Sequence, residues 1–182
     1  MADQLVKQSG GKAIVFARLR SNQATQEGTR VAYQTTYSYK LSRDSKTEDT
    51  KDGKVTKGGA LEGTLSLELL SSNQAIVRDL ESAQVNAYPL DFWIVFTDTP
   101  GTKSGTYAGR YMIADLTSFE ETGDSDNSVS VKIEASIQDG YARLGDVTLS
   151  VDQQDNGYDF KDLGKVSTSE TTSTNTAPTP TK

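Results

Sequence analysis

The side chains that most often carry out chemistry in proteins are few in this chain. Its 182 residues include no Cys and no His, so a thiolate nucleophile, a disulfide, and the commonest general base and transition-metal ligand are all missing. Carboxylates and lysines remain, but pairs such as Glu120 and Glu121 fall in a predicted turn with no apolar pocket around them. An enzyme that works through carboxylates is therefore the least favoured class, and we assign no catalytic residue.

One acidic segment has part of the spacing of a calcium-binding loop. Oxygen-bearing side chains recur at every second residue of 124–128, but Val129 stands where such a loop needs a glycine and Ala135 where it needs a bidentate glutamate. The acidic segment 152–157 suggests the same idea and receives the same interpretation, an Asx-rich turn. A phosphate-binding loop is not indicated either, because Ala13 follows Gly11-Lys12 where Ser or Thr is needed. We predict neither a metal nor a cofactor.

The composition fits one ordinary domain with extensions, and it narrows the possible partners. Acidic residues outnumber basic ones by 25 to 19, for a net charge of −6. A protein that grips nucleic acid needs a clustered basic surface, so this balance argues against that function. No run of about 18 apolar residues suggests a membrane span, and residues 1–5 lack the basic start and apolar stretch of a secretory signal.

Alternation of apolar and polar residues predicts seven or eight short strands. Apolar side chains at every second position indicate a sheet that is buried on one face and wet on the other. The strands are expected at 13–19, 31–41, 61–70, 92–96, 107–119, 129–138 and 144–151. The strand at 92–96 is apolar throughout, so we expect it to be covered on both faces. Irregular spacing in 107–119 suggests a β-bulge.

A single helix is predicted between the strands, at 71–86. Ser71 and Gln74 have the spacing of a capping box, with Asn86 as a stop. The fold class is therefore mainly β, a β-sandwich or barrel with one flanking helix. We divide the chain into an N-terminal arm at 1–12, a β domain at 13–151, a C-terminal arm at 152–165 and a Ser/Thr/Pro-rich tail at 166–182, which we expect to be disordered.

Between Leu41 and Gly59 the chain has almost no apolar residue, although strand-like segments flank it on both sides. Lys51-Asp52-Gly53-Lys54 lies near the middle of this segment, and Asp-Gly is a strong signal for a tight hairpin turn. The pattern predicts a long β-hairpin that projects beyond the core. Because a two-stranded ribbon without an apolar face is marginal in water, we expect 41–59 to be disordered in a free subunit and ordered by another molecule.

Two features of the strands concern function. The strands at 61–70 and 129–138 each present a row of hydroxyl, amide and acidic side chains opposite an apolar row, which is either plain solvent exposure or the lining of a wet space. Several tyrosines recur at alternating positions and could form a stacking platform, although we favour the core for them: Tyr33, Tyr37, Tyr39, Tyr107 and Tyr111.

Taken in order, these segments resemble the major tail tube proteins of long, non-contractile-tailed bacteriophages. The matching features are the arm before the first strand, the hairpin at 41–59, the single helix after an acid-bearing strand and the Trp-containing strand that follows it. Gly157-Tyr158-Asp159-Phe160 before a polar tail completes the match, which covers nearly the whole chain.

The resemblance implies a structural virion protein, assembled in the host cytoplasm. Six subunits would join their sheets edge to edge into a ring, and stacked rings would form a tube through which DNA passes without specific binding. Its partners would be further copies of itself, the tape measure protein, the tail terminator and the distal tail protein, with no membrane partner.

The resemblance also assigns roles to individual residues. The residues expected to line the lumen are Glu62, Thr64, Ser66, Glu68, Ser130, Lys132, Glu134 and Ser136. Those expected to contact neighbouring subunits and rings are Lys51, Asp52, Gly53, Lys54, Tyr158, Phe160 and Leu163. The alternative is a carbohydrate-binding or Ig-like adhesion module on a virion or cell surface, which explains the tyrosines but gives no reason for the bare hairpin.

Overall fold

The computed structural model describes residues 8–72, 74–123, 125, 128–150 and 153. Eight antiparallel strands form one continuous sheet in the order β2-β1-β5-β6-β7-β4-β3, and β8 pairs with β6. The strands are β1 (Ala13–Leu19), β2 (Thr29–Arg30), β3 (Gln34–Thr50), β4 (Gly53–Leu70), β5 (Leu90–Pro100), β6 (Tyr107–Thr122), β7 (Ser130–Ile137) and β8 (Arg143–Val147). Two 3-10 turns, η1 (Gly10–Lys12) and η2 (Arg20–Asn22), flank β1.

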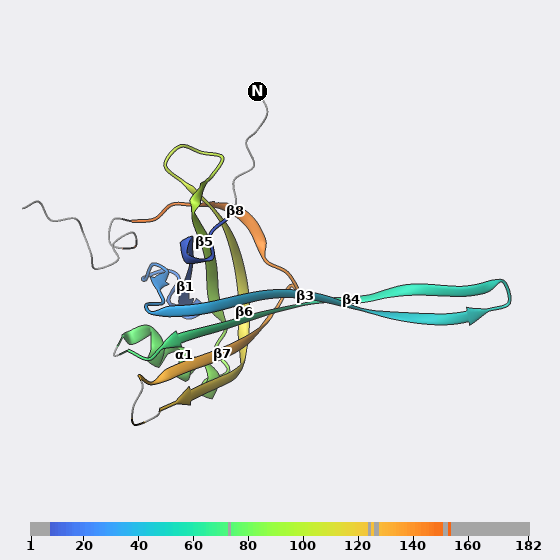
Figure 1. The fold of residues 1–182 in the computed structure, drawn as a ribbon, viewed down its shortest axis with the longest axis horizontal. Helices are drawn as coiled ribbons and strands as arrows, with labels where there is room; N and C mark the ends of the chain where they lie inside the picture. Colours follow the sequence, from blue (N-terminus) through green and yellow to red (C-terminus); the bar gives the residue numbers. More distant parts are fainter. Residues whose placement is uncertain (1–7, 73, 124, 126–127, 151–152, 154–182) are drawn as a thin grey trace, which may run out of the picture.

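The long strand β6 belongs to both halves of the sheet. Its first part, Tyr107–Ala114, pairs with β5 on one side, and residues 107–111 of it pair with β8 on the other. Its second part, Ala114–Thr122, pairs with β7, with a register shift between Leu116 and Ser118 that fits the predicted bulge. The two halves face each other across one main core (Figure 1). The predicted mainly β class, consistent with a sandwich, is confirmed.

The main core is built from the alternating apolar faces of both halves. Leu65, Leu67 and Leu69 of β4 are fully or almost fully buried, and so are Phe92 and Ile94 of β5. On the other face of β5, Val95 packs with Phe16 and Leu149 in a second, smaller cluster. The strand predicted at 92–96 is therefore covered on both faces, and it extends further, from Leu90 to Pro100.

The predicted helix is present as α1 (Ala75–Asn86), which buries Ile76, Val77, Leu80 and Ala83 against the main core. The predicted capping box is wrong. The N-cap is Gln74, whose side chain makes no capping hydrogen bond and instead accepts one from the backbone N–H of Ala32. The backbone N–H of Ser71 donates to the backbone carbonyl of Val129. Both groups expected to close the capping box, the Gln74 side chain and the Ser71 N–H, therefore bond to distant segments instead. The helix does end at Asn86, as predicted, and Ala87 follows in the left-handed conformation.

The start of β3 also differs from the prediction. The predicted strand includes Val31 and Tyr33, but β3 begins at Gln34. Tyr33 has a φ of 55° and is 67% exposed, while Val31 is buried just before the strand. The side-chain amide of Gln34 bonds to the backbone of β1: its Oε1 accepts from the N–H of Val15, and its Nε2 donates to the carbonyl of Val15. A side-chain amide therefore bonds to the edge of β1 opposite β5, next to the two residues that pair with β2.

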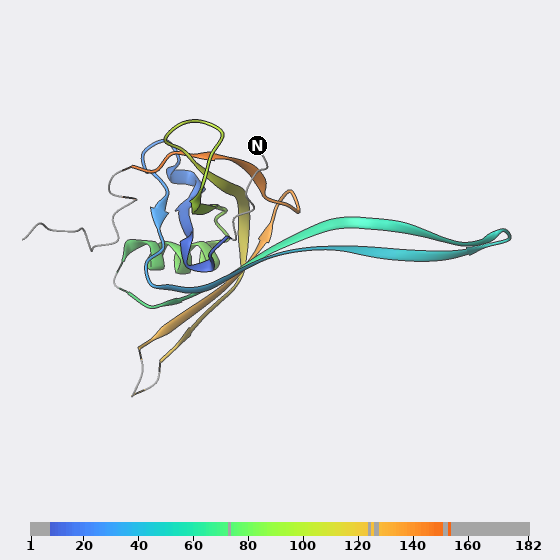
Figure 2. The same ribbon diagram turned by 45° about the horizontal axis from the view of Figure 1, so that its top comes forward.

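The hairpin of β3 and β4 projects far beyond the body of the molecule (Figures 1 and 2). It leaves the body where two glycines meet: a Cβ on Gly63 would lie 2.5 Å from the carbonyl oxygen of Gly140, and one on Gly140 would lie within 2.4 Å of the carbonyl oxygen of Leu61. Gly140 also has a φ of 73°. Only glycine lets the chains approach this closely. No helix among the described residues is long and apolar enough to cross a membrane.

The position of Leu67 gives a direct test of the core. We expect Leu67→Ala to lower the free energy of unfolding by about 2–5 kcal/mol, because its side chain is 1% exposed and its loss leaves a cavity. Leu144→Ala removes the same atoms from a side chain that is 76% exposed, so it should change the free energy by less than about 0.5 kcal/mol. Urea denaturation of the monomer measures both, and equal effects would contradict the assigned core.

Candidate assembly surface

The polar side chains of four adjacent strands form one continuous surface, which we call the polar face. Directly opposed residues share a face of a sheet, and Lys40, Thr64, Ser136 and Asp115 follow one another across β3, β4, β7 and β6. The polar face comprises Thr36, Ser38, Lys40, Ser42, Glu62, Thr64, Ser66, Glu68, Asp115, Ser118, Glu120, Thr122, Ser130, Lys132, Glu134 and Ser136.

All eight residues predicted to line a lumen lie on the polar face, and the structure brings them together. Thr64 lies opposite Ser136, Ser66 opposite Glu134, and Glu68 opposite Lys132. All eight side chains are exposed or half-buried, and none belongs to the core. The eight residues therefore share one exposed surface, and their role in a lumen stays a prediction. The lumen prediction left out the polar residues of β3 and β6, which the pairing of the strands adds to the same face.

The buried side of the same strands fixes which residues face outward. Leu65, Leu67 and Leu69 alternate with the polar residues of β4, and Val131 and Ile133 do the same on β7. A slip of one residue would expose this apolar row and bury the charges. The core therefore sets the register of the polar face.

The polar face is acidic. It carries five carboxylates, on Glu62, Glu68, Asp115, Glu120 and Glu134, against two lysines. Lys132 lies opposite Glu68 on one side and Glu120 on the other, and its Nζ is 3.9 Å from Oε1 of Glu134. Such an exposed pair contributes little stability, but it places this lysine among acids of its own subunit.

The strands of the predicted hairpin pair up to Thr50 and Gly53, with a register shift between Arg43 and Ser45. The turn residues are Lys51 and Asp52, one position earlier than the predicted Asp52-Gly53, and Gly53 takes the positive φ of 125°. Contacts across the ribbon are polar: Lys57 and Glu48 form an ion pair of 2.9 Å, and the hydroxyls of Thr47 and Thr56 lie 3.3 Å apart. The ribbon packs on nothing else in the described chain, as its uniformly exposed side chains from Asp44 to Gly58 show.

Several predicted residues lie outside the described part of the chain. Tyr158, Phe160 and Leu163, and most of the acidic segment 152–157, belong to this group, as do Asp124, Asp126 and Asn127 of the calcium-like segment. Within the described residues, no three His, Cys, Asp or Glu side chains form a group that could hold a metal ion.

A buried charge cluster in the β1–β5 half was not anticipated. Asp91 is fully buried and accepts hydrogen bonds from Arg18 Nη2 at 2.7 Å, Arg20 Nη1 at 2.9 Å and the Tyr111 hydroxyl at 2.8 Å. Burial and the bond to Asp91 raise the pKa of Tyr111, and the bonds to Tyr111 and Asp91 raise the pKa of Arg20. The sequence holds two signals for this cluster. Asp91 stands at the start of an apolar strand, and Arg18 and Arg20 are two residues apart at the end of the first strand.

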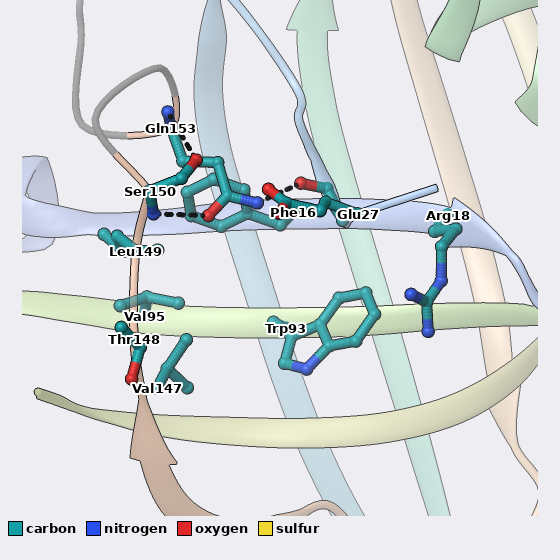
Figure 3. A pocket seen from close by; sticks show the side chains of 11 residues that line it. Phe16, Arg18, Glu27, Trp93, Val95, Val147, Thr148, Leu149, Ser150 and Gln153 are labelled. Carbon is teal, nitrogen blue, oxygen red and sulfur yellow. Dashed lines mark hydrogen bonds between the residues drawn. The ribbon is translucent and has the colours of Figure 1, made fainter. Parts of the chain in front are cut away.

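A groove of about 450 Å³ lies on the outer side of the same strands (Figure 3). Phe16, Trp93, Val95 and Leu149 line it, and the Arg18 guanidinium lies 5.1 Å from the centre of the Trp93 ring. Gln153 closes one side, with its Nε2 donating to the backbone carbonyl of Gly28 at 2.8 Å. Polar residues complete the lining, among them Glu27, Thr148 and Ser150.

A carboxylate also fixes the loop between β5 and β6. Asp146 accepts hydrogen bonds from the backbone N–H and the hydroxyl of Thr102 and from the backbone N–H of Lys103. These bonds, chiefly those from Thr102, lower the pKa of Asp146. The role of this cluster is structural, because all of its acceptor oxygens are directed at the loop backbone.

Comparison with known proteins agrees with this architecture. Residues 8–140 match the family model described as phage tail tube protein. The solved SPP1 tail tube is similar over 88% of this chain and 94% of its own, with 17% identity and a TM-score of 0.70. A chain from the virion of a native gene transfer agent particle matches over 78% of this chain and 100% of its own, with 9% identity and a TM-score of 0.56.

A third similar structure comes from the sheath–tube complex of an extracellular contractile injection system. It matches 75% of this chain and 89% of its own, with 15% identity and a TM-score of 0.52. At these identities the solved structures show a shared fold. A search of curated proteins gives no match.

The buried cluster gives a prediction about stability. Asp91→Asn should lower the free energy of unfolding by about 3–5 kcal/mol, because it leaves two partly buried guanidiniums without their carboxylate. Asp49→Asn is the matched control, since Asp49 pairs with Lys54 at 3.8 Å but is 80% exposed, and it should cost less than about 1 kcal/mol. Thermal and urea denaturation measure both variants. Equal losses of unfolding free energy would show that Asp91 does not hold a stabilising buried cluster.

Proposed function

The chain belongs to the family of phage tail tube proteins, and on that basis we propose that six copies of it form a ring and that rings stack into the tube through which phage DNA passes. The observation that carries the proposal is the polar face, an exposed, acidic surface that ends in an unpaired strand edge on each side. The role is structural rather than catalytic, and the protein is a component of the virion.

Both ends of the polar face are open for pairing. β3 is the last strand of the sheet, and no described strand pairs with its second edge. β5 pairs with β6 only as far as Ala114, so one edge of residues 115–122 is also free. Exposed edges normally invite association with another chain. The two edges therefore supply the joints of a ring.

The strand directions allow such a ring to close. Because β6, β7, β4 and β3 are successively antiparallel, the four strands end in edges of opposite direction. Pairing β3 of one copy with β6 of the next therefore continues an antiparallel sheet without interruption. Six four-stranded sheets at about 4.8 Å per strand give a wall about 115 Å in circumference and about 37 Å in diameter, before strand tilt widens it. This opening is wider than a DNA duplex.

The side chains near the two edges support the same joint. Tyr37 and Tyr39 of β3 and Leu116 and Phe119 of β6 pack against the main core but remain half-buried. Edge pairing between copies would cover the exposed parts of these side chains. Removal of this apolar surface from water would stabilise the ring.

The charge of the polar face suits a channel for DNA. Each copy contributes five carboxylates and two lysines, so six copies present a wall of net negative charge. DNA carries about one charge per 1.7 Å of its axis, and it is repelled by such a wall. We therefore assign Glu62, Thr64, Ser66, Glu68, Ser130, Lys132, Glu134 and Ser136 to the lumen, where they would let DNA pass without specific binding.

The projecting hairpin is assigned to contacts between rings. Its ribbon has no packing partner within the described chain, and Lys51, Asp52, Gly53 and Lys54 lie at its far end, where they would meet a neighbouring copy. Tyr158, Phe160 and Leu163 of the C-terminal arm would serve as apolar anchors on a neighbour. The tape measure protein, the tail terminator and the distal tail protein are the further partners that this role implies.

Electron microscopy of the purified full-length chain tests the proposal. We expect tubes with a central channel and sixfold symmetry, which averaged end-on views would show. The adhesion-module alternative predicts monomers that bind a glycan array instead. Monomers that form neither rings nor tubes over a range of concentrations and salt would contradict the proposal.

Shortening the hairpin separates ring formation from stacking. Replacement of residues 44–59 by a two-residue turn should leave the melting temperature of the monomer within about 2 °C, because these side chains contribute nothing to the core. The same change should abolish long tubes while allowing single rings. Sedimentation velocity and microscopy measure both, and normal tubes from the shortened chain would rule out this role for the hairpin.

A further inference from the structure

The two free edges of the polar face carry opposite charges. Along Gln34–Ser42 of β3 the single charged residue is Lys40, whereas residues 115–122 of β6 contain three acids and no base. Lys40, Asp115 and Glu120 are exposed. Among the described residues none of the three forms an ion pair, and Asp115 accepts its hydrogen bond from the neutral amide of Gln138 at 3.0 Å. The edges are therefore electrostatically unsatisfied within one copy.

Lys40 and Asp115 end the same cross-strand row, with Thr64 and Ser136 between them. When β3 of one copy pairs with β6 of the next, Lys40 lies directly or diagonally opposite Asp115 or Glu120 in every register that sets it against residues 115–122 and keeps polar side chains on one face. Diagonal neighbours in a sheet are about 7–8 Å apart, within reach of a lysine. An ion pair between copies follows from the pairing that the edges allow.

The alternative pairing of edges is a two-fold dimer, in which each edge meets its own copy. Pairing β6 with β6 places the carboxylates of Asp115 and Glu120 against the same acids, and pairing β3 with β3 brings together two basic edges. Like charges on directly opposed strands are destabilising. Head-to-tail contacts instead generate closed rings or open filaments.

We propose that Lys40 of one copy pairs with Asp115 or Glu120 of the next, and that this ion pair selects head-to-tail ring closure over a two-fold dimer. The inference rests on the proposed ring and adds the residues that determine which edge meets which. The partner surface is a second copy of this chain.

Two complementary variants test the ion pair. Lys40→Glu makes both edges acidic, and the double change Asp115→Lys with Glu120→Lys makes both edges basic. Each variant alone should raise the critical concentration for assembly about tenfold or more, since every joint then opposes like charges. Sedimentation and electron microscopy measure the assembled fraction.

Mixing the two variants in equal amounts gives the decisive result. In an alternating ring the acidic β3 edge of one variant meets the basic β6 edge of the other, and the remaining joints keep the original pairing of Lys40 with acids. We expect tubes to return at close to the wild-type critical concentration, with a composition of one to one by mass spectrometry. A single chain with all three changes should also assemble, because each of its joints pairs the reversed charges.

A third variant controls for the change in net charge. Arg78→Glu makes the same change in net charge on the exposed face of α1 and should assemble as the wild type does. The ion pair is refuted if Lys40→Glu assembles normally, if the mixture of two folded variants stays monomeric, or if Arg78→Glu is equally impaired. Failure of the wild-type chain to form tubes would refute the proposed function instead.

Discussion

The structure depends on the burial of one face of a continuous antiparallel sheet. Leu65, Leu67 and Leu69 enter the core from β4, and the alternation of the strand then forces Thr64, Ser66 and Glu68 outward. The bent strand β6 lets the same sheet cover its own core, so helix α1 and the β1–β5 half complete the body. What remains uncovered is a polar face bounded by two unpaired strand edges. The packing of the core thus determines the surface that we propose for assembly.

A fold of this kind is stable in its body and incomplete at its margins. Phe119 and Tyr37 at the edges pack against the core but stay half-buried, and the bare ribbon from Asp44 to Gly58 has no contact with the core. Further copies of the chain could satisfy all of them at once, through sheet pairing at the edges and contacts along the ribbon. The buried cluster of Asp91 with two arginines lies in the opposite half, where it supports the body and leaves the polar face free to assemble.

Features with a local period could be predicted from sequence, whereas contacts between distant segments could not. Alternation located β4 and β7 and with them the lumen candidates, and the Asp-Gly turn signal located the long hairpin. The helix start was wrong because Ala32 and Val129, distant in sequence, take the groups expected to cap it. The salt bridges of Asp91 join residues 71 and 73 positions apart, so no spacing rule reveals them. The hairpin turn lies one residue earlier than predicted, because of Asp52 and Gly53 only Gly53 takes a positive φ.

The absence of cysteine allows the central claim, that the polar face lines a closed channel, to be measured directly. A single Ser66→Cys substitution places one thiol in the middle of that face. A bulky polymer-linked maleimide should label it rapidly in monomers and not in intact tubes, while a small maleimide that can diffuse along the channel should label both. Equal labelling of monomers and intact tubes by the bulky reagent would show that the polar face lies outside the tube and would contradict the account.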